Sequence, residues 1–168
     1  FQHARIRFLT QVWQKDRDLK QEGFDFSDIA VQQALSTFNS YTAAATKPAE
    51  LLLTEAQLTK ALYKYAAHTT GQNGFTRHHQ STDKANGFLN HGNYLAYGLA
   101  ACCLWVLGIP HGFAVMHGKT RRGALVFDVA DLIKDALVLP WAFICAKEQA
   151  TEQEFRQQVL QAFTNHKA

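Results

Sequence analysis

Four residues of the chain combine the side-chain types of a divalent-metal site: Glu55, His117, Asp128 and Asp131. Three carboxylates and one imidazole suit a hard cation such as Mg²⁺ or Mn²⁺, whereas a structural zinc site would require thiolates. Such a cation polarises a phosphoryl oxygen, activates water or a 3′-hydroxyl, and stabilises the leaving oxygen. The four residues therefore predict a phosphoryl-transfer centre if the fold brings them together.

Glu55 breaks the pattern of the helix that contains it. It lies four residues after Leu51 and three before Leu58, so it falls on an apolar stripe. A carboxylate on a core-facing stripe costs free energy unless it is paired or bound to a metal. The alternative places Glu55 at the edge of the stripe, paired with Thr59 or a lysine, and Glu55 taken alone favours that alternative.

Asp128 and Asp131 stand three residues apart, so their carboxylates emerge on one side of a helix. We expect Asp128 to open that helix, because aspartate is a good N-cap and the helix dipole favours acidic residues in the first turn. Capping leaves two carboxylates that repel one another, and a divalent cation would remove the repulsion. The pair is therefore compatible with a capped helix or with a metal site.

His117 follows the apolar residues 112–116 and precedes Gly118, which would let the chain turn sharply and present the imidazole. A lone histidine after an apolar segment is more often structural than a ligand. Its assignment to the site therefore depends on the acidic residues.

Asparagines recur along one face of the helix expected at 85–107. Asn86, Asn90, Asn93 and Tyr97 follow one another at steps of four, three and four. Asparagine is a mediocre helix former, so this density needs a reason. We expect Asn86 to join a buried hydrogen-bond ladder to the neighbouring helices, and the other positions either to extend that ladder or to face a polar ligand such as a phosphate backbone.

Basic residues gather on both sides of these motifs, after His117 and in the loop at 72–84. A basic cluster is usually a solvated surface, but beside an acidic metal site it is where a phosphodiester would be neutralised. The predicted DNA-binding residues are Arg77, Asn90, Tyr97, Lys119, Arg121 and Arg122.

The elements that must position these residues are helices. Apolar spacing and capping signals predict helices at about 6–20, 29–38, 48–68, 85–107, 128–137, from 140 and from 151. Residues 124–127 are predicted to form a short extended piece. The fold class is all-α, with at most a minor short hairpin.

Composition bounds the remaining possibilities. The 168 residues are 47% hydrophobic and 18% charged, which is typical of one globular domain. The net charge of +3 permits a nucleic-acid partner without requiring one. The cysteines at 102, 103 and 145 fit neither a disulfide framework nor a zinc site, so we expect buried thiols in a reducing cytoplasm.

Two further expectations concern the ends and the longest apolar run. The run at 94–107 is too short to span a bilayer and is expected to be a buried core helix. Phe1 opens directly into a helical pattern without a signal peptide, so we expect it to lie within a longer protein.

An ordered series of motifs between about residues 48 and 145 resembles the CRISPR-associated protein one family. The motifs are Thr54-Glu55-Ala56, residues 83–86 leading into 90–98, residues 112–119, and residues 126–134. Their order is far more specific than any single motif. The insert at 119–123, between the histidine and the aspartate pair, is most similar to subtype I-F.

The resemblance implies the integrase–nuclease of CRISPR adaptation, an antiviral defence. Its ligands for Mg²⁺ or Mn²⁺ would match Glu55, His117 and Asp131, with Asp128 an accessory acid or second ligand. The implied reaction is attack by the 3′-hydroxyls of a new spacer on leader–repeat phosphodiesters, with double-stranded and branched DNA as partners. Residues 1–168 would form the helical C-terminal catalytic domain, without the family's N-terminal β-rich domain.

The resemblance also implies protein partners. The full-length protein would be a homodimer bridged by CRISPR-associated protein two, which in subtype I-F is fused to the helicase–nuclease of interference. No membrane partner is expected. Two other functions stay open: a non-catalytic DNA-binding scaffold in which the aspartates only cap a helix, and an all-helical metal phosphohydrolase that uses His78 and His79 as additional ligands.

Overall fold

The structure is a computed structural model that describes residues 1–80, 82–118 and 122–168. Lys119 and Arg121, two of the predicted DNA contacts, lie outside these residues. The described part of the chain is all-α, as predicted, and contains no strand or hairpin. Its elements are α1 (Gln2–Lys15), α2 (Arg17–Gln21), α3 (Ile29–Ala44), α4 (Pro48–Thr69), α5 (Lys84–Val106), α6 (Ala124–Ile133), the π-helix η1 (Lys134–Val138), α7 (Leu139–Lys147) and α8 (Glu152–Asn165).

Several helices begin where their capping signals predicted. Asp28 accepts a hydrogen bond of 2.8 Å from the backbone N–H of Ala30 at the start of α3, and α4 starts at Pro48. At α8, the Glu154 carboxylate accepts from the Thr151 N–H and the Thr151 hydroxyl accepts from the Glu154 N–H. These contacts satisfy backbone donors that a helix cannot satisfy internally.

The segment from 124 to 147 differs from the prediction. Residues 124–127 are helical rather than extended, so α6 begins after Gly123 and Asp128 lies inside it instead of opening it. Pro140 does not start a separate helix, because η1 joins α6 to α7 without a break. Pro140 has no N–H to offer the carbonyl of Ala136, and the Trp13 indole donates to that carbonyl instead, at 3.0 Å.

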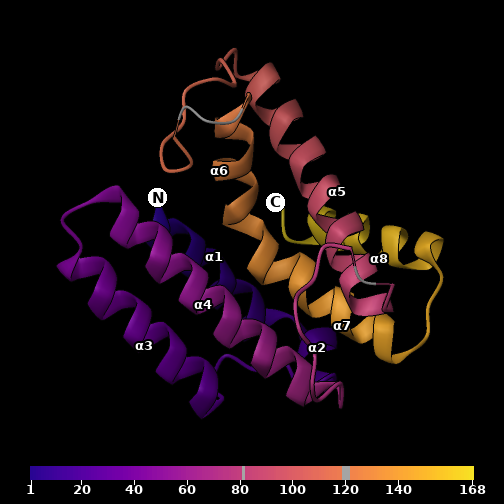
Figure 1. The fold of residues 1–168 in the computed structure, drawn as a ribbon. Helices are drawn as coiled ribbons and strands as arrows, with labels where there is room; N and C mark the ends of the chain where they lie inside the picture. The colour runs from indigo at the N-terminus through magenta and orange to yellow at the C-terminus, as the bar shows by residue number, and fades with distance from the viewer. Residues whose placement is uncertain (81, 119–121) are drawn as a thin grey trace.

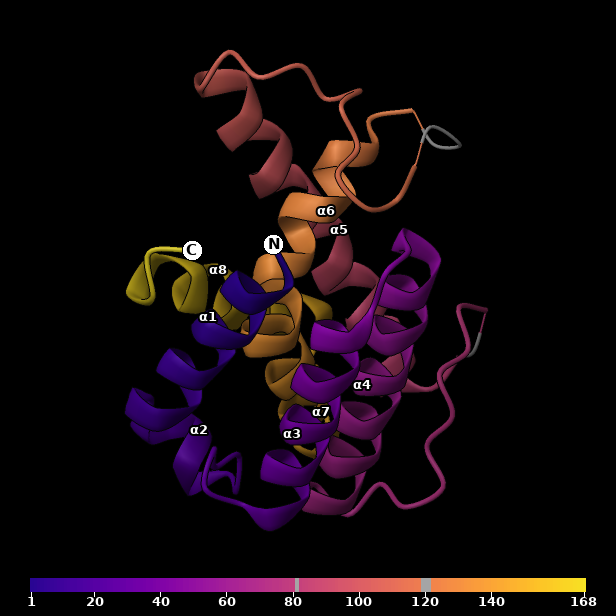
Figure 2. The same cartoon turned by 90° about the vertical axis from the view of Figure 1, so that its left-hand side faces the viewer.

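This continuous column of α6, η1 and α7 lies at the centre of the molecule (Figures 1 and 2). It contacts α5 on one side and α1 and α4 on the other, while α8 covers α5 and the lower part of the column. Helix α3 packs against α4 at the outer edge. Side chains from α1, α4 and the column therefore meet across a shared interior.

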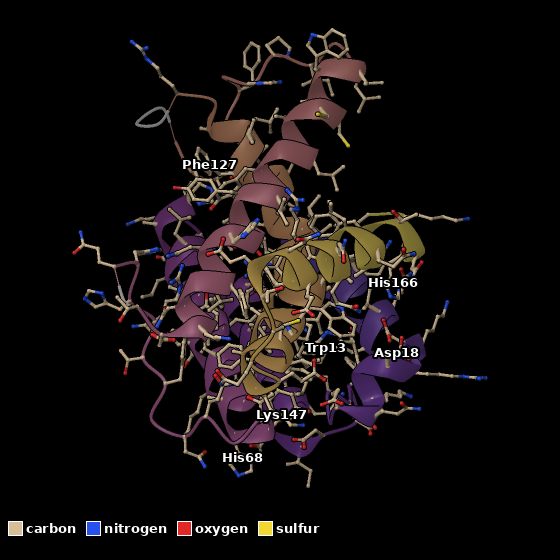
Figure 3. The ribbon with its side chains drawn as sticks, turned by 90° about the vertical axis from the view of Figure 1, so that its right-hand side faces the viewer. Trp13, Asp18, His68, Phe127, Lys147 and His166 are labelled. Carbon is tan, nitrogen blue, oxygen red and sulfur yellow. The ribbon has the colours of Figure 1, made fainter. Side chains whose placement is uncertain are left out.

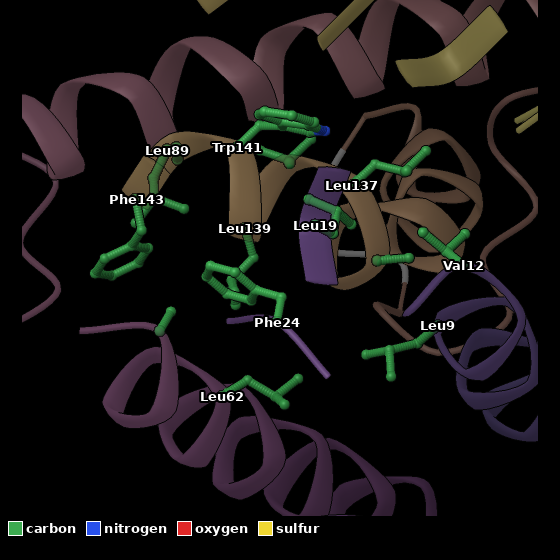
Figure 4. Packing of buried hydrophobic residues seen from close by; sticks show 14 of the residues in the cluster. Leu9, Val12, Leu19, Phe24, Leu62, Leu89, Leu137, Leu139, Trp141 and Phe143 are labelled. Atoms are coloured by element: carbon green, nitrogen blue, oxygen red, sulfur yellow. The ribbon is translucent and has the colours of Figure 1, made fainter. Parts of the chain in front are cut away.

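That interior is apolar and aromatic. Figure 4 shows Leu9, Phe24, Leu62 and Leu137 among the side chains that fill it, and all four are 0% exposed. Burial of such side chains is the main favourable contribution to folding. The site described below is held at one end of this packed core.

One glycine marks a close helix crossing. A Cβ at Gly92 would collide with Val138 Cγ1 and lie 3.0 Å from Phe155 Cζ, so α5 approaches η1 and α8 only because residue 92 lacks a side chain. A Cβ at Gly87 or Gly98, in contrast, would meet nothing within 4 Å.

The structure at the end of α5 differs from two predictions. This end of the helix extends past the body of the molecule with α6 as its neighbour, so Trp105 is 79% exposed and the run 94–107 is buried on one face only. Cys102 is exposed and Cys103 half-buried, so the expectation of buried thiols holds for Cys145 alone. Among the described residues, no helix has the length and hydropathy needed to cross a membrane.

Candidate metal centre

Three aspartates lie on one face of the central column. Asp128, Asp131 and Asp135 follow one another at steps of three and four, and their exposed fractions are 0%, 3% and 5%. Buried carboxylates require partners, and each of the three has a different one.

Asp128 holds the loop that carries His117. Its Oδ2 accepts backbone hydrogen bonds from Val115 (2.6 Å) and Met116 (3.1 Å), and its Oδ1 accepts one from His117 (3.2 Å). Burial raises the pKa of this carboxyl, but the hydrogen bonds from the His117 ring and the backbone outweigh burial and bring the pKa below its ordinary value. Asp128 is therefore not the helix cap that we predicted; it fixes a loop that precedes the helix.

The same carboxylate orients the imidazole of His117. His117 Nδ1 lies 2.6 Å from Asp128 Oδ1, while Nε2 lies 3.7 Å from Asp131 Oδ2. A carboxylate acceptor favours the tautomer with the proton on Nδ1, which leaves the Nε2 lone pair free to bind a metal. Phe127, labelled at the upper left of Figure 3, has its ring centroid 6.3 Å from that of His117 and marks the position of the site.

Glu55, His117 and Asp131 converge and are called the metal triad below. Each offers one ligand atom, and these atoms all lie within 4.8 Å of one another. Two bonds of about 2 Å join ligand atoms at most about 4 Å apart, so the side chains would draw slightly closer together around a bound Mg²⁺ or Mn²⁺. Within the described residues, this is the group of His, Cys, Asp or Glu side chains close enough to hold a metal ion. Asp128 is not part of the group.

Glu55 reaches the triad from α4, and its partners come from α1. Gln2 Nε2 donates to Glu55 Oε2 at 2.8 Å, and Arg5 Nη1 lies 3.2 Å from Glu55 Oε1. Among the described residues, Glu55 thus pairs with Gln2 and Arg5 rather than with Thr59 or a lysine. Burial, and to a smaller extent the charge of Asp131, raise the pKa of Glu55, while Arg5 acts in the opposite direction.

Lys134 contacts Asp131 from one turn further along the column. Its ammonium forms an ion pair with Asp131 Oδ1 and lies 5.1 Å from the centroid of the Tyr97 ring. Burial lowers the pKa of Lys134, but Asp131 and the other neighbours raise it, so the amine stays charged. The Tyr97 ring packs in turn on Phe127, with ring centroids 4.8 Å apart.

The charges of the site match one divalent cation. Four carboxylates and two basic side chains leave a charge of −2 when the histidine is neutral, which one Mg²⁺ or Mn²⁺ would cancel. The acidic groups are Glu55, Asp128, Asp131 and Asp135, and the basic ones are Arg5 and Lys134. The oxygen-rich donor set also suits these ions, so the residues present fit the predicted metal.

The Asn face of α5 organises the preceding loop. Arg77 donates to Asn86 Oδ1 at 2.8 Å and to Asn90 Oδ1 at 2.6 Å, and Asn86 Nδ2 donates to the carbonyl of Thr76 at 2.9 Å. The expected ladder exists at Asn86, but it ties α5 to the loop rather than to neighbouring helices. Of the basic cluster at 119–122, Arg122 lies in the described chain, and its side chain is exposed.

Sequence reasoning missed four residues of the site, namely Gln2, Arg5, Lys134 and Asp135. Arg5 could have been found, because it lies four residues before Leu9 and seven before Val12, on a buried stripe like that of Glu55. Asp135 was visible as a third carboxylate on the Asp128 face. Gln2 and Lys134 carry no comparable signal.

The fold and the triad together define an all-helical domain with a candidate divalent-metal centre. The chain belongs to the Cas1 family, because the family described as CRISPR associated protein Cas1 matches residues 3–168. The family resemblance seen in the motifs is thereby confirmed.

Two relatives are named CRISPR-associated endonuclease Cas1. The protein from Pectobacterium atrosepticum is 52% identical over 170 residues, which cover 100% of this chain and 52% of the relative. The protein from Pseudomonas aeruginosa is 51% identical over 162 residues, which cover 95% and 50%. The chain thus spans about half the length of the relatives it matches.

Proposed function

We propose that the chain is the helical catalytic domain of a divalent-metal-dependent DNA endonuclease and integrase of subtype I-F. It would insert new spacers into a CRISPR array through attack of their 3′-hydroxyls on leader–repeat phosphodiesters. The observation that carries the proposal is the metal triad, with three ligand atoms within 4.8 Å in a member of the Cas1 family. The endonuclease name of both relatives supports phosphodiester chemistry.

The residues of the site would divide the chemistry between them. Glu55, His117 and Asp131 would hold Mg²⁺ or Mn²⁺, which when bound supplies charge to polarise the phosphoryl oxygen and activate the attacking oxygen. Asp128 keeps Nε2 of the His117 imidazole turned toward Asp131. Lys134 holds the Asp131 carboxylate in place from one turn further along the column. Such catalysis rests mainly on positioning and charge neutralisation.

DNA would approach across the face that joins the triad to α5. Arg122 is exposed and, with Lys119 and Arg121, is proposed to neutralise backbone phosphates. Arg77 and Asn90 would shape the neighbouring loop through their mutual hydrogen bond. Tyr97 would line the approach to the triad, beside Phe127 and Lys134. The whole protein is proposed to form a homodimer and to bind CRISPR-associated protein two.

The test is strand transfer by the whole protein with Mn²⁺ or Mg²⁺ on a leader–repeat target. His117→Ala and Asp131→Ala are expected to abolish product while circular dichroism shows a retained fold. His68→Ala and Asp18→Ala are matched controls, since both side chains are exposed and lie far from Phe127 (Figure 3). Normal integration by the His117 variant would refute the proposed site.

The two other functions make different predictions. A DNA-binding scaffold predicts that Glu55→Ala leaves activity on branched DNA unchanged, and its premise of a capping aspartate fails because Asp128 lies inside α6. A phosphohydrolase predicts turnover of nucleotides without dependence on Arg122. Its additional ligands, His78 and His79, are exposed and are not part of the metal group found in the described chain.

A further inference from the structure

Arg5 is a buried cation at the rear of the metal triad. Its side chain is 3% exposed, and its guanidinium hydrogen-bonds to two acceptors and forms an ion pair with Glu55. Nη1, the nitrogen that faces Glu55, makes no hydrogen bond within the described residues. Nε donates to Asp135 Oδ2 at 2.7 Å, Nη2 donates to Thr59 Oγ1 at 3.1 Å, and Nη1 lies 3.2 Å from Glu55 Oε1. The residue therefore links α1 to α4 and to η1 behind the site.

Asp135 determines how strongly Arg5 can hold Glu55. Both Nε and Nη2 of Arg5 contact the Asp135 carboxylate, so the guanidinium meets Glu55 through Nη1 alone. A guanidinium that turned both arms of its fork to Glu55 would compete with a metal for that ligand, because bidentate Arg–carboxylate pairs are strong. The anchor on Asp135 limits this competition and keeps Arg5 in one orientation.

The contacts also restrict the direction in which Glu55 points. Arg5 forms an ion pair with Glu55 and donates to Thr59, one turn further along α4. Gln2 donates to the second carboxylate oxygen of Glu55. Each carboxylate oxygen thus has one partner from α1 and keeps a lone pair for a cation. Gln2 also donates to Met116 Sδ at 3.0 Å, next to His117, so α1 touches both sides of the triad.

We propose that Arg5, anchored by Asp135, is a positioning residue that presets Glu55 as a metal ligand. The inference rests on the proposed metal site and adds a determinant outside the ligand set. Loss of the fork geometry at constant charge should therefore weaken metal binding, since partners that orient a ligand contribute about 10- to 100-fold to metal affinity.

The experiment compares Arg5→Lys with Arg7→Lys in the whole protein. Both substitutions keep the charge and lie on α1, but Arg7 is exposed. Mn²⁺ affinity is measured by electron paramagnetic resonance titration, and the folded fraction by urea unfolding. Arg5→Lys is expected to raise the Mn²⁺ dissociation constant about tenfold, while Arg7→Lys leaves it unchanged.

A second variant covers the case in which Arg5→Lys does not fold. Thr59→Val removes one acceptor of Arg5 and leaves every charge in place, so a rise of about threefold in the dissociation constant is expected. If folded Arg5→Lys, or failing that Thr59→Val, binds Mn²⁺ as the Arg7 control does, the positioning role is overturned. If the unsubstituted protein and the control bind no Mn²⁺, the proposed metal site itself fails.

Discussion

Asp128→Asn tests how the loop at 115–117 is held. In the native structure, Oδ1 accepts from the backbone and ring nitrogens of His117, and Oδ2 accepts from the N–H groups of Val115 and Met116. The carboxamide of asparagine has the same shape but one oxygen and one NH₂ group. Whichever way it turns, its NH₂ group faces two donors.

The expected cost follows from this count. Two charge-assisted hydrogen bonds are lost, each contributing about 1.5–3 kcal/mol, and the donors left behind are buried. We therefore expect the free energy of unfolding of the metal-free protein to fall by about 3–6 kcal/mol. Because the same group orients His117, Mn²⁺ affinity should also fall by about 10- to 100-fold.

Urea unfolding and Mn²⁺ titration measure the two effects. Asp28→Asn is the matched control, because Asp28 accepts one backbone hydrogen bond at the start of α3, where asparagine caps equally well. The control should change stability by less than about 0.5 kcal/mol. A variant at Asp128 that matches the control in both assays would refute the assigned role.

Three further predictions follow from burial and local geometry. Since the pKa of Asp128 is lowered on folding, its contribution to stability is present above about pH 4 and is lost as the pH falls through the lowered folded value. Urea unfolding should therefore show that the difference in the free energy of unfolding between the native protein and Asp128→Asn shrinks over that pH range. Gly92→Ala should destabilise the fold by about 1–3 kcal/mol, because the new Cβ collides with a neighbouring side chain. Gly98→Ala, where a Cβ meets nothing within 4 Å, should be neutral or stabilising by up to about 1 kcal/mol in the same assay. Burial is the main cause that raises the pKa of Cys145 to about 12, so iodoacetamide at pH 8 should label exposed Cys102 and leave Cys145 unmodified until the protein unfolds, as peptide mass spectrometry would show.

Local signals were sufficient for most of the helices but not for the start of α6. Residues 124–127 form a short apolar run whose periodicity does not distinguish a strand from a buried helix. In the structure these residues are helical, and α6 packs against α1 and α5. Because the helix begins at Ala124, Asp128 lies inside it and not at the cap position that the sequence predicted. A cap depends on a few neighbouring residues, whereas these contacts join distant parts of the chain.

The sequence alone determined which residues were candidates. A carboxylate on an apolar stripe, as at Glu55, is visible from helical periodicity, and two aspartates three apart are visible from spacing. Only the tertiary structure decided which residues each candidate contacts. Asp128 binds a loop 13 residues earlier, and Arg5 pairs with Asp135 across a separation of 130 residues. Periodicity carries information about one helix face, while the partner on that face depends on how the helices pack.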